Sequence, residues 1–237
     1  YPQYFKKEYL NVADQIICIS ENTKNDLLNY YKIDAKKISV IPLGIDRSQF
    51  FKETNVNFLK LPFILFVGDR KNYKNFNNFI RAFSLSKKLM ENFNVICFGG
   101  ENFDKYEIEL FQKLKIKENK IRQFTGSDEE LNYFYKTASL YVCSSLYEGF
   151  GLTILEAMNM NCPIVTSNRG SLREVGKNIV EYFNPENVEE ISNVIENFVF
   201  STEKIENQKK SFKEHLKKFS WESTAEKTID LYKKICP

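Results

Sequence analysis

The sequence has few of the residues that build metal sites or disulfide frameworks, and no stretch that could cross a bilayer. It contains one histidine, no Asp-x-Asp pair, and five widely spaced cysteines that lie mostly in apolar runs. This cysteine pattern indicates buried, reduced side chains of a cytosolic protein, because it has neither a metal-ligand spacing nor an even number. The apolar runs are too short for a membrane helix, and the opening residues lack the pattern of a signal peptide.

An excess of one sign of charge is also lacking. The 34 basic and 31 acidic side chains of the 237 residues give a formal net charge of +3 and are spread along the chain. This distribution gives no indication of a nucleic-acid partner. It leaves a peripheral contact with a membrane open but unsupported. With 43% hydrophobic and 27% charged residues, the composition is that of a globular protein with enough apolar material for a core.

From residue 61 onward, short apolar runs alternate with amphipathic stretches, which predicts strands alternating with helices. Such alternation favours a parallel, doubly wound, Rossmann-like α/β sheet with right-handed crossovers. In the strand order 3-2-1-4-5-6, the first and fourth strands are neighbours, and a ligand crevice opens at their carboxyl ends. The six predicted strands are residues 63–68, 94–100, 121–126, 140–143, 163–167 and 179–183.

The helices between these strands are marked by apolar stripes and capping residues. Ser127 with Glu130 predicts a capping box, and Ser171 with Glu174 predicts the cap of a short helix. The single histidine, His215, falls late in a helix and is expected to be an exposed surface residue. The predicted helices are residues 75–92, 104–115, 127–137, 152–159, 171–176, 188–200, 203–218 and 221–235.

Residues 1–46 do not make a complete domain by themselves. They predict a strand (15–20), a helix capped near Ser20 or Asn22, and a second strand (37–44). Two strands and one helix leave apolar faces open. We therefore expect that they end an amino-terminal Rossmann-like domain, with on the order of 100 to 150 further residues upstream. Residues 47–60 predict a linker, residues 61–218 the second domain, and residues 219–237 a terminal helix that packs back toward the first.

The fourth strand of the predicted sheet leads into a loop and a helix that can hold an anion. Two glycines, Gly149 and Gly151, end the strand run before the helix pattern begins. The backbone N–H groups of residues 150–153 should point outward from the helix start, where a phosphate is favoured. Glu148 and Glu156 flank this cradle. Spacing alone does not establish a function, because 31 acidic residues give such pairs by chance.

The residues around these two glutamates point to a family. The stretch YEGFGLTILEAM resembles the signature of the retaining glycosyltransferases of family 4, the glycosyltransferase group 1 proteins with the GT-B fold. In that signature Glu-x7-Glu encloses Gly-Phe-Gly. The resemblance implies that Glu148 lies against the transferred sugar, that the amides between the two acids hold the distal phosphate, and that Glu156 binds the ribose hydroxyls. Residues 13–46 resemble the end of the family's amino-terminal domain and the start of its hinge.

A cationic loop follows the first strand of the predicted sheet and should face the same crevice. Arg70 offers a planar fork for two phosphate oxygens, and Lys74 offers a compact charge. Three cations on an exposed loop need no functional explanation. However, VGDRKNYKN resembles the family's G-x-R-x-x-Y-K-N loop, in which the arginine and the lysine hold the donor phosphates. The additional Lys71 has no assigned role.

From the residues and the resemblance together, we expect Glu148, Arg70 and Lys74 to be the catalytic residues. No metal and no cofactor are expected, because Arg70, Lys74 and the helix start would neutralise the diphosphate. Gly99 follows the second strand of the sheet, and Gly126 lies where the family places the nucleotide base. The expected donor-binding residues are Gly68, Arg70, Lys74, Gly99, Gly126, Glu148, Gly149, Phe150, Gly151, Leu152, Thr153 and Glu156.

The resemblance implies a cytoplasmic hexosyltransferase, working at the inner face of a membrane if it associates with one. It would move a sugar such as mannose from a GDP- or UDP-sugar to a glycan or a lipid-linked saccharide in polysaccharide or lipopolysaccharide biosynthesis, with retention at the anomeric carbon. Two alternatives stay open. One is a non-catalytic module that binds nucleotide sugars, and the other is a different GT-B enzyme such as a nucleotide-sugar epimerase. The Gly-Phe-Gly between the glutamates argues against the epimerase.

Overall fold

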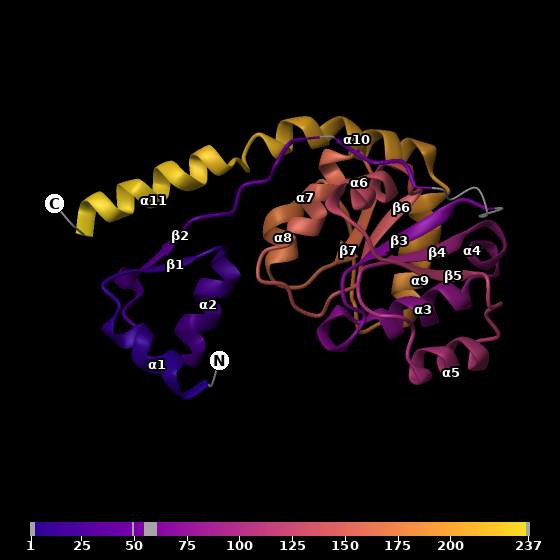
Figure 1. Ribbon diagram of the computed structural model, residues 1–237, viewed down its shortest axis with the longest axis horizontal. Helices are drawn as coiled ribbons and strands as arrows, with labels where there is room; N and C mark the ends of the chain where they lie inside the picture. The colour runs from indigo at the N-terminus through magenta and orange to yellow at the C-terminus, as the bar shows by residue number, and fades with distance from the viewer. Residues whose placement is uncertain (1–2, 49, 55–60, 236–237) are drawn as a thin grey trace.

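The computed structural model describes residues 3–48, 50–54 and 61–235, which form a small unit and a larger sheet domain (Figure 1). The small unit contains a two-stranded parallel sheet of β1 (Ile16–Cys18) and β2 (Ile38–Val40). Its helices are α1 (Gln3–Val12), α2 (Glu21–Tyr30) and the 3-10 turn η1 (Ala35–Lys37). The predicted strand–helix–strand order is confirmed, with Ser20 as the N-cap of α2. Helix α1 was not predicted, although Phe5, Tyr9 and Val12 recur at helical spacing.

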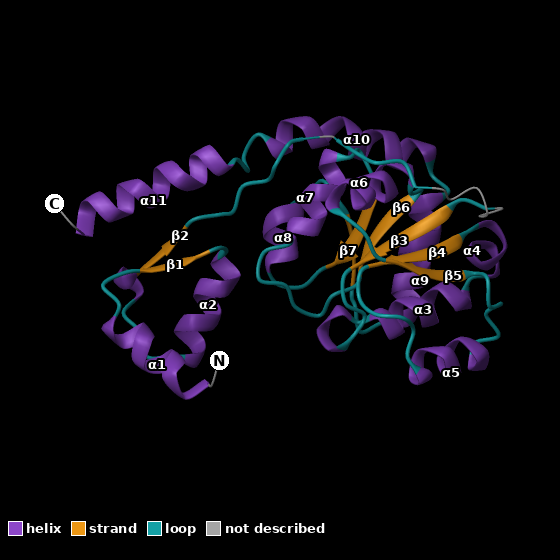
Figure 2. Cartoon of the chain, in the orientation of Figure 1, coloured by secondary structure: helices purple, strands orange, loops and turns teal. Residues whose placement is uncertain are grey.

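The larger domain is built on a six-stranded parallel sheet in the order β5-β4-β3-β6-β7-β8 (Figure 2). This order is the predicted 3-2-1-4-5-6. The first and fourth strands are hydrogen-bonded neighbours, with Ile64 in register with Leu140, so the loops after them leave the same edge of the sheet. The strands are β3 (Phe63–Val67), β4 (Asn94–Phe98), β5 (Ile121–Phe124), β6 (Leu140–Cys143), β7 (Ile164–Ser167) and β8 (Glu181–Phe183).

Helices cover both faces of this sheet, because the side chains of its central strands are buried on both sides. One face packs against α6 (Asp128–Thr137), α7 (Leu152–Asn159), α8 (Ser171–Gly176) and α10 (Thr202–Leu216). The other face packs against α3 (Phe76–Leu85), α4 (Lys87–Asn92), α5 (Lys105–Lys113) and α9 (Val188–Val199). The capping box of Ser127 with Glu130 at the start of α6 is confirmed.

The single helix predicted over residues 75–92 is wrong in one respect, because the chain breaks it into α3 and α4 at Ser86. The backbone of Ser86 is extended, and its hydroxyl oxygen accepts from the amide of Leu89, which makes Ser86 the N-cap of a new helix. The same hydroxyl donates to Glu196 of α9 at 2.5 Å. The break is therefore held by a partner 110 residues away, which sequence periodicity does not record.

His215 is buried, so the expectation of an exposed surface histidine was wrong. Only 2% of its surface is exposed, and its Nε2 lies 2.6 Å from the carbonyl oxygen of Val175 in α8. The ring also packs edge-on against Phe219, which in turn packs edge-on against Phe150. Burial lowers the pKa of His215, so the neutral ring is favoured at this position.

The terminal helix α11 (Trp221–Ile235) continues beyond the sheet domain toward the small unit (Figure 1). No side chain within Trp221–Ile235 is buried. Its first turn contacts the segment that follows β2: Thr224 donates to the carbonyl of Pro42 at 2.8 Å, and a side chain at Gly44 would collide with the backbone of Trp221. Across the described parts of the chain, no helix is both long enough and apolar enough to pass through a bilayer.

Candidate functional site

The loops after β3 and β6 meet at an ion pair. Nζ of Lys74 lies 2.7 Å from Oε1 of Glu148, and the two side chains are only 15% and 14% exposed. Oε1 of Glu148 also accepts from the hydroxyl of Ser145 at 2.7 Å. The expected meeting of these loops is confirmed, because β3 and β6 are neighbours and end at the same edge.

Lys74 stays charged in this setting. Burial acts to lower its pKa, but the hydrogen bond and the negative charge of Glu148 outweigh it, and the pKa of Lys74 is raised. The site therefore keeps one cation that is largely shielded from water. Such a cation interacts with an anion more strongly than an exposed lysine would.

Further hydrogen bonds hold the two loops together. The amide of Leu146 donates to the carbonyl of Tyr73 at 2.7 Å, and the hydroxyl of Ser144 donates to the carbonyl of Lys74 at 2.8 Å. The side chain of Asn75 donates to the carbonyl of Ser144 at 3.2 Å. Asn75 has a left-handed backbone that ends the 3-10 turn η2 (Asn72–Lys74), a conformation that asparagine tolerates. Lys74 is thus placed by a fixed turn.

Arg70 lies in a separate cluster, and its guanidinium does not present the free fork that we expected. It is 7% exposed, and its Nε donates to Glu107 of α5 at 2.7 Å. Its other N–H groups donate to the carbonyls of Gly99 and Glu101, and its charge lies 4.7 Å from the ring centre of Phe103. The donors predicted to hold phosphate oxygens are therefore occupied by protein acceptors in this structure.

Sequence reasoning missed Glu107 as the partner of Arg70. Its signal was local: Asp104 and Glu107 form a capping box at the start of α5, with each side chain bound to the other's backbone amide. The Asp-x-x-Glu spacing predicts a helix start. It does not reveal that the same carboxylate also neutralises an arginine 37 residues earlier.

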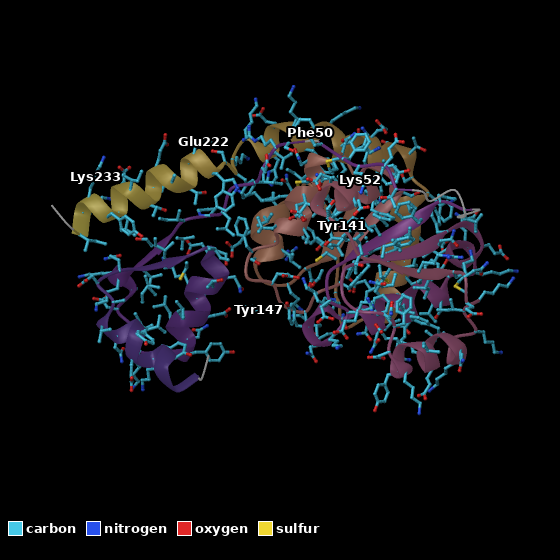
Figure 3. The ribbon with its side chains drawn as sticks, viewed as in Figure 1. Phe50, Lys52, Tyr141, Tyr147, Glu222 and Lys233 are labelled. Atoms are coloured by element: carbon cyan, nitrogen blue, oxygen red, sulfur yellow. The ribbon has the colours of Figure 1, made fainter. Side chains whose placement is uncertain are left out.

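Glu156 faces a different environment, one turn into α7. Burial raises the pKa of its carboxyl, and the hydrogen bond from the Tyr135 hydroxyl at 3.1 Å acts in the opposite direction. Glu156 and Leu152 line a groove of about 460 Å³, which also includes Asn132 and Phe50. Phe50 of the predicted linker (labelled in Figure 3) lines this groove, and Asn132 donates to its carbonyl at 2.9 Å.

The start of α7 leaves backbone donors without protein partners. Gly151 is its N-cap, with a left-handed φ of 109°, and no side chain caps the helix. Within the described residues, the N–H groups of Gly149, Phe150 and Gly151 have no hydrogen-bond acceptor. Donors without partners at a helix start bind anions readily. The free donors overlap the predicted cradle, residues 150–153, at Phe150 and Gly151, and the structure adds Gly149 to them.

Two of the predicted glycines lie where the loops approach one another. Gly68 and Gly99 both have positive φ, and a side-chain carbon on Gly99 would lie 3.5 Å from the backbone of Gly68. A carbon on Gly68 would likewise lie 3.5 Å from the side chain of Lys74. Gly126 has a structural reason of its own, since a side chain there would collide with Glu130 of the α6 capping box.

The predicted cap of α8 was wrong, and its two residues bind elsewhere. The N-cap of α8 is Gly170, without a side-chain hydrogen bond. Ser171 instead donates to the carbonyl of Glu148 at 2.6 Å. Glu174 accepts from the backbone amides of Glu21 and Asn22 at the start of α2. The sequence pattern pairs these two residues with each other, whereas in the fold each binds a partner from a distant segment.

No cluster of three His, Cys, Asp or Glu side chains that could hold a metal ion occurs in the described ranges 3–48, 50–54 and 61–235. The four cysteines described there are free and buried.

Comparison with known sequences identifies the family. The sequence profile of the glycosyl transferases group 1 matches residues 47–218. The chain belongs to this family. Residues 1–49 match a second profile, glycosyltransferase family 4. The sheet domain has the fold of the GT-B glycosyltransferases, as its structural neighbours do.

Individual relatives of the chain are distant in sequence and close in fold. It is 28% identical to the uncharacterized glycosyltransferase MJ1607 of Methanocaldococcus jannaschii, over 95% of this chain and 62% of the relative. It is 28% identical to the O-antigen chain mannosyltransferase RfbU of Salmonella typhimurium, over 83% of this chain and 54% of the relative. The structure of Anabaena Alr3699/HepE in complex with UDP-glucose superposes with a TM-score of 0.83 at 15% identity, over 99% and 70% of the two chains. The chain thus spans little more than half of these curated relatives.

Proposed function

We propose that this chain forms the donor-binding half of a retaining hexosyltransferase that uses a nucleotide-diphosphate sugar. The observation that carries the proposal is the meeting of Lys74 and Glu148 beside a helix start whose preceding amides have no partner among the described residues. A cation and free amides suit the leaving diphosphate, and an acid beside them suits the sugar hydroxyls. Few other ligands combine an anionic group and hydroxyl groups within a few ångströms of each other.

The distal phosphate lies on the free amides of residues 149–151, with Lys74 as its counter-ion. In the absence of a ligand, Glu148 neutralises Lys74. When the donor binds, the phosphate shares that cation, and the carboxylate of Glu148 becomes available to accept hydrogen bonds from the sugar. This exchange avoids leaving a shielded charge without a partner in either state.

The transfer step breaks the bond between the anomeric carbon and the phosphate oxygen. The acceptor hydroxyl oxygen bonds to the same face of that carbon, and its proton passes to the departing phosphate oxygen. Lys74 and the amides of the α7 start stabilise the negative charge that grows on the diphosphate. No metal is required, since the charge is met by these groups.

The nucleoside extends from the cradle into the groove lined by Leu152 and Glu156. The carboxylate of Glu156 accepts from the ribose hydroxyls, and the wall around Asn132 and Phe50 meets the base. Gly126 lies just before α6, at the entrance to this region. Arg70 does not bind the phosphate in this proposal, because its donors are already bound to Glu107 and to carbonyls of the turn after β4. Its role is to hold that turn in place.

The known relatives favour a hexose from a GDP- or UDP-sugar. RfbU is an O-antigen chain mannosyltransferase, and the HepE structure holds UDP-glucose. By analogy, the acceptor is a glycan or a lipid-linked saccharide in polysaccharide or lipopolysaccharide assembly on the cytoplasmic side of a membrane. The acceptor would bind across the crevice, on the amino-terminal side.

Calorimetry with GDP-mannose and UDP-glucose, with and without EDTA, tests the donor site. We expect micromolar binding of one of the two, unchanged by EDTA, and its loss in Glu156→Ala. A Glu118→Ala variant is the control, because Glu118 precedes β5, at the edge of the sheet opposite the strand ends that carry the site. Absence of binding to either sugar nucleotide would contradict the proposal. Binding without transfer to any acceptor by the intact protein would favour a non-catalytic module, and recovery of an epimerised donor would favour an epimerase.

A further inference from the structure

Hydroxyl groups bind the backbone carbonyls of the phosphate cradle, and two of these hydroxyls belong to the small unit. The carbonyl of Gly149 lies 2.8 Å from the hydroxyl of Ser20 and 3.2 Å from the hydroxyl of Thr23, both at the start of α2. The carbonyl of Glu148 accepts from Ser171 of α8 at 2.6 Å. Ser20 and Ser171 are essentially fully buried. The two carbonyls therefore have fixed directions.

Fixing these carbonyls also fixes the amides that follow them. A trans peptide is planar, and its C=O and N–H point in opposite directions. A Gly149 carbonyl held toward α2 therefore turns the N–H of Phe150 away from α2. A Glu148 carbonyl held toward α8 turns the N–H of Gly149 away from α8. These are the donors that have no protein acceptor among the described residues.

Further contacts bind the same three elements to one another. Glu174 of α8 accepts from the amides of Glu21 and Asn22 at 2.9 and 2.6 Å, which satisfies the start of α2 with a negative charge. The hydroxyl of Tyr147, labelled between α2 and the sheet domain in Figure 3, donates to Asp26 of α2 at 2.7 Å. Helix α2, helix α8 and the loop thus form a closed set of contacts.

We propose that Ser20, Thr23 and Ser171 are positioning residues that aim the peptide planes of Glu148–Phe150 at the distal phosphate. The cradle is complete only while α2 is docked against the loop. Binding of the diphosphate and docking of the small unit then favour each other, because each stabilises the same peptide orientation. This inference rests on the proposed function, since it assigns a phosphate to those amides.

Ser20 and Thr23 must be changed together. Each hydroxyl has one hydrogen, and Ser20 lies within hydrogen-bond distance of both Gly149 and the Thr23 hydroxyl, so either residue can supply the donor to Gly149. Ser20→Ala with Thr23→Val removes both hydroxyls. Ser171→Ala removes the α8 hydroxyl that donates to the Glu148 carbonyl. This variant tests the same loop if the double variant does not fold. Thr23→Ser keeps the hydroxyl and should behave as wild type.

The readout compares a nucleoside diphosphate with its monophosphate, which lacks the distal phosphate. UDP and UMP, and GDP and GMP, are titrated calorimetrically into the protein at constant salt. We expect the double variant and Ser171→Ala to lose roughly tenfold in diphosphate affinity and less than twofold in monophosphate affinity. Ser201→Ala is the control: it removes a serine N-cap from α10 and is expected to lower the melting temperature without changing either affinity.

The outcomes separate the two proposals. A selective loss of diphosphate affinity supports the positioning role. Equal losses for both nucleotides, or no loss for either, in variants whose wild-type parent binds, overturn the positioning role and leave the donor site standing. A wild-type protein that binds no nucleotide overturns the donor site and the positioning role together.

Discussion

At the residue scale, the cradle depends on groups whose charge is set by their surroundings. Lys74 is kept charged by Glu148, and Glu156 is held in a setting that disfavours its ionised form. Neither property follows from residue type. Lys71 is exposed and close by in sequence, but it lacks the shielding that makes Lys74 suited to a phosphate.

Lys74→Ala should weaken binding of a nucleoside diphosphate by roughly 10- to 100-fold, because it removes a charge-assisted hydrogen bond of about 1.5–3 kcal/mol. Lys71→Ala, three residues earlier in the same loop, removes the same charge from an exposed position and should change affinity less than twofold. Isothermal titration of both variants checks this. Equal effects from the two substitutions would show that only the net charge of the loop matters.

Glu156→Gln should stabilise the fold at neutral pH while weakening nucleotide binding. Burial raises the pKa of Glu156 above its ordinary value of 4.5. The folded state therefore binds the proton more tightly than the unfolded state does, and stability decreases as the pH rises from about 4.5 through the raised pKa. A neutral glutamine avoids this loss. Melting curves should show a higher melting temperature for the variant at pH 7 and no difference at pH 4. The opposite order would contradict the burial argument.

At the element scale, residues at the starts of helices also bind segments that are distant in the sequence. Helix α5 caps itself with Glu107 and uses the same side chain to neutralise Arg70, and α2 takes its charged cap from Glu174 of α8. Such double use means that a substitution in one helix also disturbs a loop elsewhere. The structural role of Arg70 is the clearest case.

Glu107→Ala should destabilise the sheet domain by about 3–5 kcal/mol, because it leaves the buried guanidinium of Arg70 without a counter-ion. Glu109→Ala is the control: this residue lies in the same helix and pairs with Lys105 at the surface, so its loss should change stability by less than about 1 kcal/mol. Urea denaturation gives both values. A small effect of Glu107→Ala would mean that the backbone carbonyls alone hold Arg70.

At the scale of the whole molecule, the small unit and the sheet domain share the loop that we assign to the phosphate. If docking and binding are linked, nucleotide addition should slow hydrogen exchange of the α2 amides, although α2 does not contact the proposed ligand position. The amides of α4, which precedes β4 and packs on the other face of the sheet, serve as the internal control and should not change. Protection confined to residues 144–153 would show that the loop responds alone.

Much of the fold was predictable because its signals are local. Apolar runs, helix stripes and capping boxes involve residues within a few positions of each other, and their alternation indicated a parallel, doubly wound sheet. The strand order itself was taken from the Rossmann pattern. The same holds for the cradle, where two glycines and a helix start are adjacent in sequence. Helix α1 was missed although it carries a signal of the same kind, with Phe5, Tyr9 and Val12 at helical spacing.

The sequence by itself determined the six-stranded sheet, the neighbouring positions of the Lys74 and Glu148 loops, and the free amides at the start of α7. Only the tertiary structure decided the partners of Arg70, Ser171, Glu174 and His215. For each of these side chains the sequence offers at most one nearby partner. The partner in the structure lies at least 23 residues away in the sequence. A buried donor or charge binds whichever acceptor the packing of helices on the sheet brings within 3 Å, and that proximity exists only in the folded chain.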